Sequence, residues 1–287
     1  MKVVLYTTFA LVAFAFNSIL CRLALGSGAI DPASFTAVRL ISGAIVLLLI
    51  ISFAGRAAKA AEAKSGGNWL SAFFLFAYAI CFSLAYMNLT TATGALVLFG
   101  SVQLTMLGAA LVKGERPSIL EWLGLFFALG GLVYLVFPGL SAPPLSSSAL
   151  MTAAGAAWGF YTLRGRGSLN PLAETAGNFL RSVPMIILLA LPFVYRIHLS
   201  AEGIVFAVLS GAIASGIGYA VWYAALKYHT AARAAILQLS VPALAAMGGV
   251  IFLAEAISMR LWLASALILG GIALSISGKV KPQANTD

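Results

Sequence analysis

Long stretches without a charged residue constrain this chain more than any other feature. One covers residues 65–112 and another covers residues 122–163. Each is about twice the ~20 residues that a helix needs to cross the hydrocarbon core of a bilayer. Only 9% of all residues are charged, whereas soluble proteins have about 25%. The sequence therefore predicts a polytopic α-helical integral membrane protein whose solvent is largely lipid.

Ten membrane-spanning helices account for the apolar stretches. A polar break at residues 88–91 divides the first long stretch, and a segment rich in Pro and Gly at residues 138–144 divides the second. Each long stretch therefore supplies two spans. The remaining spans are predicted at residues 3–21, 34–53, 172–194, 203–226, 234–254 and 261–278.

Basic residues are distributed unequally between the two sides of this topology. Twelve Lys and Arg residues fall in the terminal segments and in the loops after spans two, four, six and eight, and about three fall on the other side: Arg22, Arg196 and Arg260. The positive-inside rule then predicts that the N- and C-termini are both cytoplasmic. The net charge of +9 does not indicate nucleic-acid binding, because the basic residues are dispersed between apolar runs.

The chain repeats itself at an interval of about 140 residues. We therefore predict two five-helix units, at residues 1–140 and 141–287. Five is an odd number, so the second unit must enter the membrane in the opposite orientation, which is a common plan of secondary transporters. The matched residues are Arg22 with Arg164, Arg39 with Arg181, Tyr86 with Tyr223, Glu115 with Glu255, Trp122 with Trp262, and the Gly pairs at 130–131 and 270–271.

One repeated motif resembles the drug/metabolite transporter superfamily, and within it the family with two EamA domains. The second copy runs from Tyr223 through Pro242 to Glu255, and the first runs from Tyr86 to residues 114–116. The first copy departs from the pattern with Val102 in place of the proline. Residues 158–167, 171 and 178–179 are further similar to the YddG-type aromatic amino-acid exporters. The resemblance implies export of amino acids or related metabolites.

Uncharged polar and aromatic residues inside the spans are the candidates for substrate binding. A transporter of this plan binds its substrate near the middle of the membrane, where the two units meet. Their rings would pack on an apolar side chain, and their amides and hydroxyls would bind an ammonium and a carboxylate. Pro242 is expected to kink its helix. The candidates are Asn17, Tyr78, Phe99, Gln103, Trp158, Tyr161, Tyr219, Gln238 and Ser240.

Arg39 and Arg181 lie several residues inside spans two and seven. An arginine inside a span costs about 2.5–3.5 kcal/mol on insertion scales. Under the inverted topology the two belong to opposite sides, so we predict that each contributes to the gate of its own side. The alternative is that their long side chains extend to the lipid head groups.

Several chemical groups that would indicate proton coupling or catalysis are missing from the predicted spans. No Asp or Glu lies in the middle of a span, so no central proton-coupling carboxylate is expected. No zinc-hydrolase pattern and no mid-membrane Ser–His pair is found. We expect no metal and no cofactor, and a monomer in the bilayer that binds a zwitterionic small molecule. The alternatives are a carrier for drugs or other metabolites and, in another class, an intramembrane enzyme.

Overall fold

The computed structural model describes residues 2–53, 66–112, 118–137, 142–165, 168–229, 237–238 and 240–277. Within these residues the architecture is all-α, and five helices are long and apolar enough to cross a membrane. The elements are α1 (Lys2–Gly26), α2 (Pro32–Phe53), α4 (Trp69–Tyr86), α5 (Thr91–Val112), α6 (Ile119–Val136), α7 (Leu145–Gly165), α8 (Pro171–Ala190), η1 (Leu191–Arg196), α9 (Ala201–Val208), η2 (Leu209–Ile217), α10 (Gly218–Leu226), α12 (Ser240–Leu253) and α13 (Met259–Ser277).

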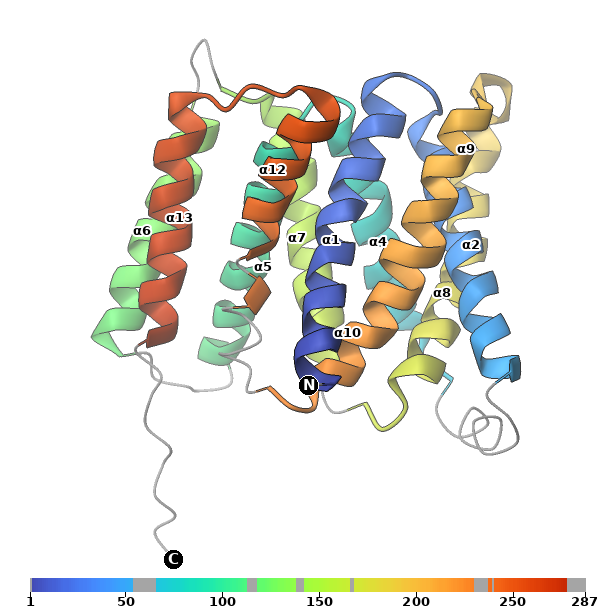
Figure 1. Cartoon of the computed structure of the whole chain (residues 1–287), viewed down its shortest axis with the longest axis horizontal. Coiled ribbons are helices and arrows are strands. Elements are labelled where there is room, and N and C mark those ends of the chain that lie inside the picture. Colours follow the sequence, from blue (N-terminus) through green and yellow to red (C-terminus); the bar gives the residue numbers. More distant parts are fainter. Residues whose placement is uncertain are drawn as a thin grey trace, which may run out of the picture.

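Ten helical segments of the described chain form two inverted five-helix repeats, as predicted. The elements α9, η2 and α10 form one continuous segment. Helix α1 leaves the face of the molecule on which α13 ends, whereas α7, the matching helix of the second repeat, runs back toward that face (Figure 1). The packing is also symmetric: α4 packs on α7, and the corresponding α9–η2–α10 segment packs on α1.

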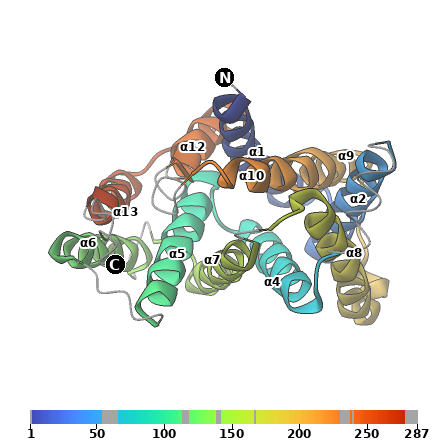
Figure 2. The same ribbon diagram turned by 90° about the horizontal axis from the view of Figure 1, so that it is seen from below.

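The repeats interdigitate rather than forming two separate lobes. Helices α6 and α13 pack together at one end of the molecule, and α2 and α8 pack together at the other (Figure 2). Helices α1, α4, α5, α7, α10 and α12 lie between these pairs. Each helix pair at an end joins one helix from each repeat, so the centre of the molecule is built jointly by both repeats.

Helix α7 is less apolar than the other central helices because protein rather than lipid surrounds much of it. Its Gly155 and Gly159 face α5 at close range, as expected for a spacing of four between small residues. A Cβ at residue 155 would lie 2.5 Å from the Leu98 carbonyl oxygen, and one at residue 159 would lie 2.9 Å from the Thr105 Cβ. Small side chains therefore allow α7 to approach the centre.

The eighth span contains a π-helical segment, η2, which the apolar pattern did not predict. Gly211 in this segment packs directly on the backbone of α2. Its neighbours Ser210 and Ser215 are fully buried and point polar groups toward the centre. A π-bulge is frequently found at functional sites, because it turns side chains away from a regular helical register.

A loop of the first repeat joins a loop of the second at the face opposite Lys2. Ile30 and Leu199 form an isolated antiparallel bridge. Burial alone would raise the pKa of the neighbouring Asp31, but hydrogen bonds from Ser34 and from the His198 backbone lower it below its usual value. The ionised carboxylate thus caps the start of α2 and ties it to the second repeat.

Candidate functional site

Two tyrosines from the two repeats touch at the centre of the molecule. The hydroxyl of Tyr219, in α10, donates a hydrogen bond of 3.2 Å to the hydroxyl of Tyr78, in α4. Tyr78 belongs to the first repeat and Tyr219 to the second. The tyrosine pair therefore lies where the two repeats meet.

Arg39 of α2 binds this tyrosine pair. Its Nη2 donates to the hydroxyl of Tyr219 at 2.9 Å and to that of Tyr78 at 3.1 Å, and its Nε donates to the Ser215 hydroxyl at 3.0 Å. Its guanidinium carbon also lies 5.1 Å from the centre of the Phe82 ring, a distance at which a cation is attracted to an aromatic face. The side chain is 1% exposed, so it does not extend to the membrane surface.

The charge of Arg39 is not neutralised by an acidic side chain of the described chain. Its Nη1 is buried and has no hydrogen-bond partner among the described residues. A buried cation without a counter-ion is costly unless a ligand or neighbouring dipoles compensate it. This arrangement can receive an anionic group, which would bind Nη1 and complete the shell around the guanidinium.

Asn17 of α1 completes the polar part of the cluster. Its Nδ2 donates to the hydroxyls of Tyr78, at 3.2 Å, and Tyr219, at 3.4 Å. Its Oδ1 accepts a hydrogen bond from the hydroxyl of Ser210 in η2. The amide is therefore held in one orientation by helices of both repeats.

Aromatic rings surround a small cavity next to this polar cluster. Trp158 of α7 packs at 4.6 Å from Tyr219 and at 5.0 Å from Tyr78, measured between ring centres, and Phe14 of α1 meets Trp158 edge-on at 5.7 Å. The cavity measures about 10 Å³, room for about one water molecule. Its lining residues are Phe14, Asn17, Ser18, Tyr78, Phe82, Leu98, Phe99, Trp158 and Tyr219.

The structure brings five of the predicted binding residues together and separates the other four. The central cavity is lined by five of them: Asn17, Tyr78, Phe99, Trp158 and Tyr219. Tyr161 lines a second pocket. Gln103 and Gln238 are not among the residues that line either pocket. Ser240 is exposed and donates its hydroxyl to the Leu237 carbonyl at 2.7 Å, within its own chain segment.

Arg181 forms its hydrogen bonds outside the cluster around the tyrosine pair. Its Nη1 donates to the carbonyl oxygens of Gly66 and Gly177, so it stays near the end of the molecule at which α4 begins. Arg181 thus binds backbone carbonyls, whereas its repeat mate Arg39 binds hydroxyls at the centre. The assignment of the two arginines to gates stays a prediction.

Pro242 lies in the first turn of α12, which begins at Ser240. The first N–H groups of a helix have no partner within the helix, so a proline costs little there. Residue 239 lies outside the described residues, and the kink expected at Pro242 stays a prediction.

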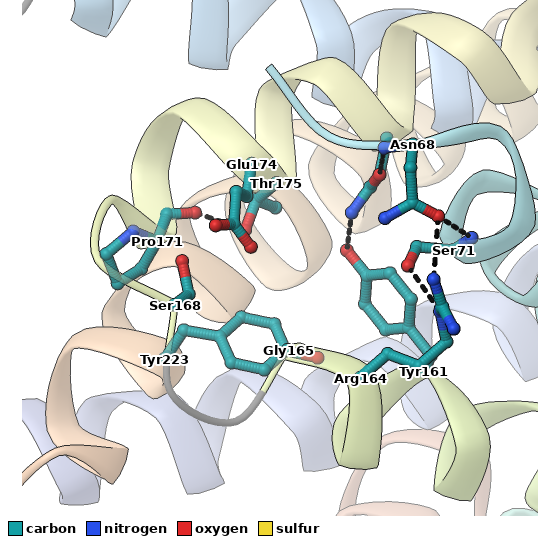
Figure 3. A pocket seen from close by; sticks show the side chains of 11 residues that line it. Asn68, Ser71, Tyr161, Arg164, Gly165, Ser168, Pro171, Glu174, Thr175 and Tyr223 are labelled. Atoms are coloured by element: carbon teal, nitrogen blue, oxygen red, sulfur yellow. Dashed lines mark hydrogen bonds between the residues drawn. The ribbon is translucent and has the colours of Figure 1, made fainter. Parts of the chain in front are cut away.

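The second pocket lies between α7, α8 and the start of α4 (Figure 3). Arg164 donates to the Ser71 hydroxyl at 3.0 Å and to the Asn68 side-chain oxygen at 3.1 Å. The pocket measures about 20 Å³ and its lining is mainly polar. It also contains the acidic residue Glu174. These residues are all on the face that is predicted to be cytoplasmic.

An ion pair joins the two repeats at the opposite face. Arg22 lies inside α1, which continues beyond the predicted span to Gly26, and its Nε is 3.5 Å from a carboxylate oxygen of Glu255. The same carboxylate accepts hydrogen bonds from the Thr91 backbone N–H, at 2.8 and 3.0 Å, and from its hydroxyl. Glu255 therefore caps α5 from the second repeat and also binds Arg22 of the first.

Removal of the Glu255 charge is expected to loosen this face. Glu255→Gln keeps one oxygen acceptor but loses the charge that assists three hydrogen bonds and the ion pair. Hydrogen bonds to charged groups contribute about 1.5–3 kcal/mol each, so we expect a clearly lower melting temperature in detergent. Glu202→Gln is the matched control, because Glu202 is exposed in the first turn of α9. Equal melting temperatures for Glu255→Gln and the wild type would contradict the assignment.

Sequence reasoning missed several residues of the central cluster. Phe14, Phe82, Ser210 and Ser215 all contact its members. Tyr78 and Tyr219 were found as polar aromatic residues within apolar spans, whereas Phe14 and Phe82 cannot be told from other apolar residues of the spans by sequence alone. No signal in the sequence distinguishes the two serines from other serines of the spans, because their role depends on the π-helical turn.

The inverted repeat and the buried polar cluster built from both of its halves define a membrane transport protein of the ten-helix type. The chain belongs to the EamA-like transporter family, whose model matches residues 1–137 and 145–277. It is therefore a multi-pass membrane transporter of the drug/metabolite superfamily and not an enzyme.

Two bacterial relatives match nearly the whole chain. An uncharacterized protein of Pseudomonas aeruginosa is 50% identical over 97% of this chain and 96% of its own length. The uncharacterized transporter YwfM of Bacillus subtilis is 28% identical over 99% of this chain and 97% of its own length. A crystal structure with 20% identity superposes with a TM-score of 0.67, covering 96% of this chain and 99% of the other, and supports the fold.

Proposed function

We propose that this transporter exports aromatic and other neutral amino acids, or closely related zwitterions, by alternating access. It works in a bacterial inner membrane as a monomer with both termini in the cytoplasm. The observation that carries the proposal is the buried Arg39 beside the tyrosine pair where the repeats meet, without an acidic partner in the described chain and with an Nη1 that has no hydrogen-bond partner there. A substrate carboxylate supplies the missing negative charge.

The walls of the central cavity suit the rest of such a substrate. Phe14, Phe99 and Trp158 offer apolar and aromatic surface, on which a ring or an aliphatic side chain packs. The Asn17 amide oxygen and the tyrosine hydroxyls accept hydrogen bonds from an ammonium group. The resemblance of residues 158–167 to aromatic amino-acid exporters agrees with this lining.

The cavity must enlarge before it holds an amino acid. About 10 Å³ is far below the several hundred Å³ of a typical small-molecule pocket. In the proposed cycle the described conformation is the contracted one, and the repeats, residues 1–140 and 141–287, move about the tyrosine pair. Arg181 belongs to the gate of its own side, whereas Arg39 binds the substrate at the centre, where the gates of both sides meet. Transport is exchange or uniport down the substrate gradient, without a central proton-coupling carboxylate.

Counterflow in proteoliposomes tests the need for a carboxylate. Liposomes loaded with an unlabelled amino acid are expected to accumulate the labelled one, with aromatic and neutral amino acids among the active compounds. The decarboxylated amine of an active amino acid is expected to exchange at least about 10-fold more slowly, because it cannot bind Arg39. Equal exchange of amine and amino acid, or no exchange of any amino acid, would refute the proposal in favour of another metabolite or drug.

A further inference from the structure

We propose that the pocket formed by Asn68, Arg164, Ser168, Glu174 and Thr175 is a second binding site, which receives the zwitterionic substrate at the predicted cytoplasmic face before it reaches the central cavity. This inference rests on the proposed function, because it assigns a further site to the same substrate. Such a site must bind the carboxylate and the ammonium of the amino acid with different residues.

Among the described residues, the lining of this pocket includes one cation and one anion that do not neutralise each other. Arg164 and Glu174 line the same pocket but form no salt bridge with each other. Arg164 uses its Nε and Nη2 for Ser71 and Asn68, and its Nη1 forms no hydrogen bond within the described residues. The Glu174 carboxylate has no hydrogen bond or ion pair in that part of the chain either.

The two charges lie at opposite ends of the pocket. In Figure 3, Arg164 is grouped with Asn68 and Ser71 at one end, and Glu174 lies beside Thr175 at the other. A simple anion would be attracted by Arg164 but repelled by Glu174, and a simple cation would meet the reverse. A zwitterion is attracted at both ends, with its carboxylate toward the guanidinium and its ammonium toward the carboxylate.

A further polar group lies at the end of the pocket where Glu174 is found. The Ser168 hydroxyl oxygen is buried and has no hydrogen-bond partner among the described residues, and Figure 3 shows this side chain beside Pro171 on the same side as Glu174. A buried hydroxyl without a partner is unfavourable, and the ammonium end of a ligand would satisfy it. A phosphate-bearing ligand is disfavoured, because one arginine faces an acid among the described lining residues.

The pocket is connected to the central cavity by the same two helices. Trp158 and Tyr161 are one turn apart on α7, and Tyr219 and Tyr223 are one turn apart on α10. The first member of each pair lines the central cavity and the second lines this pocket. Tyr161 packs on Trp158 at 5.6 Å and on Tyr223 at 5.9 Å between ring centres. These rings separate the two spaces, so a substrate passes when they part.

Glu174 also has a purely structural alternative. It lies in the first turn of α8, where a negative charge stabilises a helix. In that case Glu174→Gln would lower the melting temperature slightly and leave substrate affinity unchanged. A measurement that compares ligands of different charge separates the two roles.

The test uses inside-out membrane vesicles, which expose the predicted cytoplasmic face. Uptake of labelled L-phenylalanine is measured with 3-phenylpropionate, which lacks the ammonium, and with phenethylamine, which lacks the carboxylate, as competitors. Arg164→Gln is expected to raise the KM for phenylalanine and the inhibitory concentration of 3-phenylpropionate about 10-fold, and to lower the inhibitory concentration of phenethylamine, because a like charge is removed. Glu174→Gln is expected to raise the KM for phenylalanine and the inhibitory concentration of phenethylamine by the same factor, and to lower the inhibitory concentration of 3-phenylpropionate.

Matched controls and a binding measurement make each outcome decisive. Lys227→Gln and Glu202→Gln remove exposed charges outside the pocket and are expected to leave all three values unchanged. Arg164→Lys and Glu174→Asp, which keep the charges, are expected to restore the selectivity in part. Unchanged or uniformly changed values in Arg164→Gln and Glu174→Gln would overturn the second site alone. If the wild-type protein neither transports nor, in detergent, binds phenylalanine or any other amino acid, the proposed function fails as well.

Discussion

Replacement of Arg39 by methionine is expected to abolish amino-acid exchange without lowering the melting temperature of the protein. The loss of a buried charge partner typically costs a bound ion about 2–5 kcal/mol, which corresponds to a loss of at least about 30-fold in exchange rate. The melting temperature of Arg39→Met, in contrast, should stay the same or rise. An arginine in a span is unfavourable by about 2.5–3.5 kcal/mol on insertion scales, and apolar replacements of buried charges are often neutral or stabilising.

The remaining hydrogen bonds explain why the centre should survive this change. In Arg39→Met the tyrosine hydroxyls still bond each other and the Asn17 amide. Arg260→Met is a suitable control, because Arg260 donates to carbonyl oxygens of residues 135 and 137 in the peripheral α6–α13 pair. Its exchange rate should match that of the wild type. Wild-type exchange in Arg39→Met, measured by counterflow, would show that the guanidinium has no part in substrate binding.

Gly211→Ala is expected to damage both stability and transport. A Cβ at this position would lie 2.1 Å from the Arg39 carbonyl oxygen and 2.7 Å from the Arg39 Cα. Backbone atoms of a packed helix cannot move aside as a flexible side chain does, so α2 and η2 must separate. Overpacking of this kind costs about 1–3 kcal/mol or more. Because Arg39 is on the displaced segment, its bonds to Ser215 and Tyr219 should lengthen and exchange should fall.

Gly270→Ala is the matched control for Gly211→Ala, because this substitution is not expected to lower the melting temperature. A Cβ at residue 270 in α13 meets no atom within 4 Å, and alanine favours a helix over glycine by about 1 kcal/mol. The melting temperature in detergent should therefore stay the same or rise for Gly270→Ala and fall by several degrees for Gly211→Ala. Equal values for the two variants would mean that the close contact between η2 and α2 does not contribute to stability.

Much of the fold could be predicted from the sequence, because lipid imposes a simple rule. A chain in the bilayer must satisfy its backbone hydrogen bonds within each span, so apolar length alone indicates helices. The breaks at residues 88–91 and 138–144 separate α4 from α5 and α6 from α7, as predicted. Two local features escaped this rule: α1 continues through Arg22, which is held by Glu255, and the eighth span contains the π-helical segment η2.

The candidate site was predictable only in part. Asn17, Tyr78 and Trp158 were recognisable as polar or aromatic residues in apolar spans, and they meet in one cavity. Ser240 met the same criterion but is exposed. The criterion fails there because position along a span says how deep a residue lies, whereas the rotation of the helix decides whether it faces the protein interior.

The sequence by itself determined the solvent, the number of spans and the inverted repeat, because each depends on composition and periodicity along one chain. Only the tertiary structure decided which residues meet at the centre of the molecule. Arg39 and Arg181 occupy equivalent places in the repeat, yet one binds the central tyrosines and the other binds the carbonyls of Gly66 and Gly177. Contacts between distant segments depend on the rotation of each helix and on how closely glycines such as Gly211 let helices approach. The periodicity of apolar residues predicts neither.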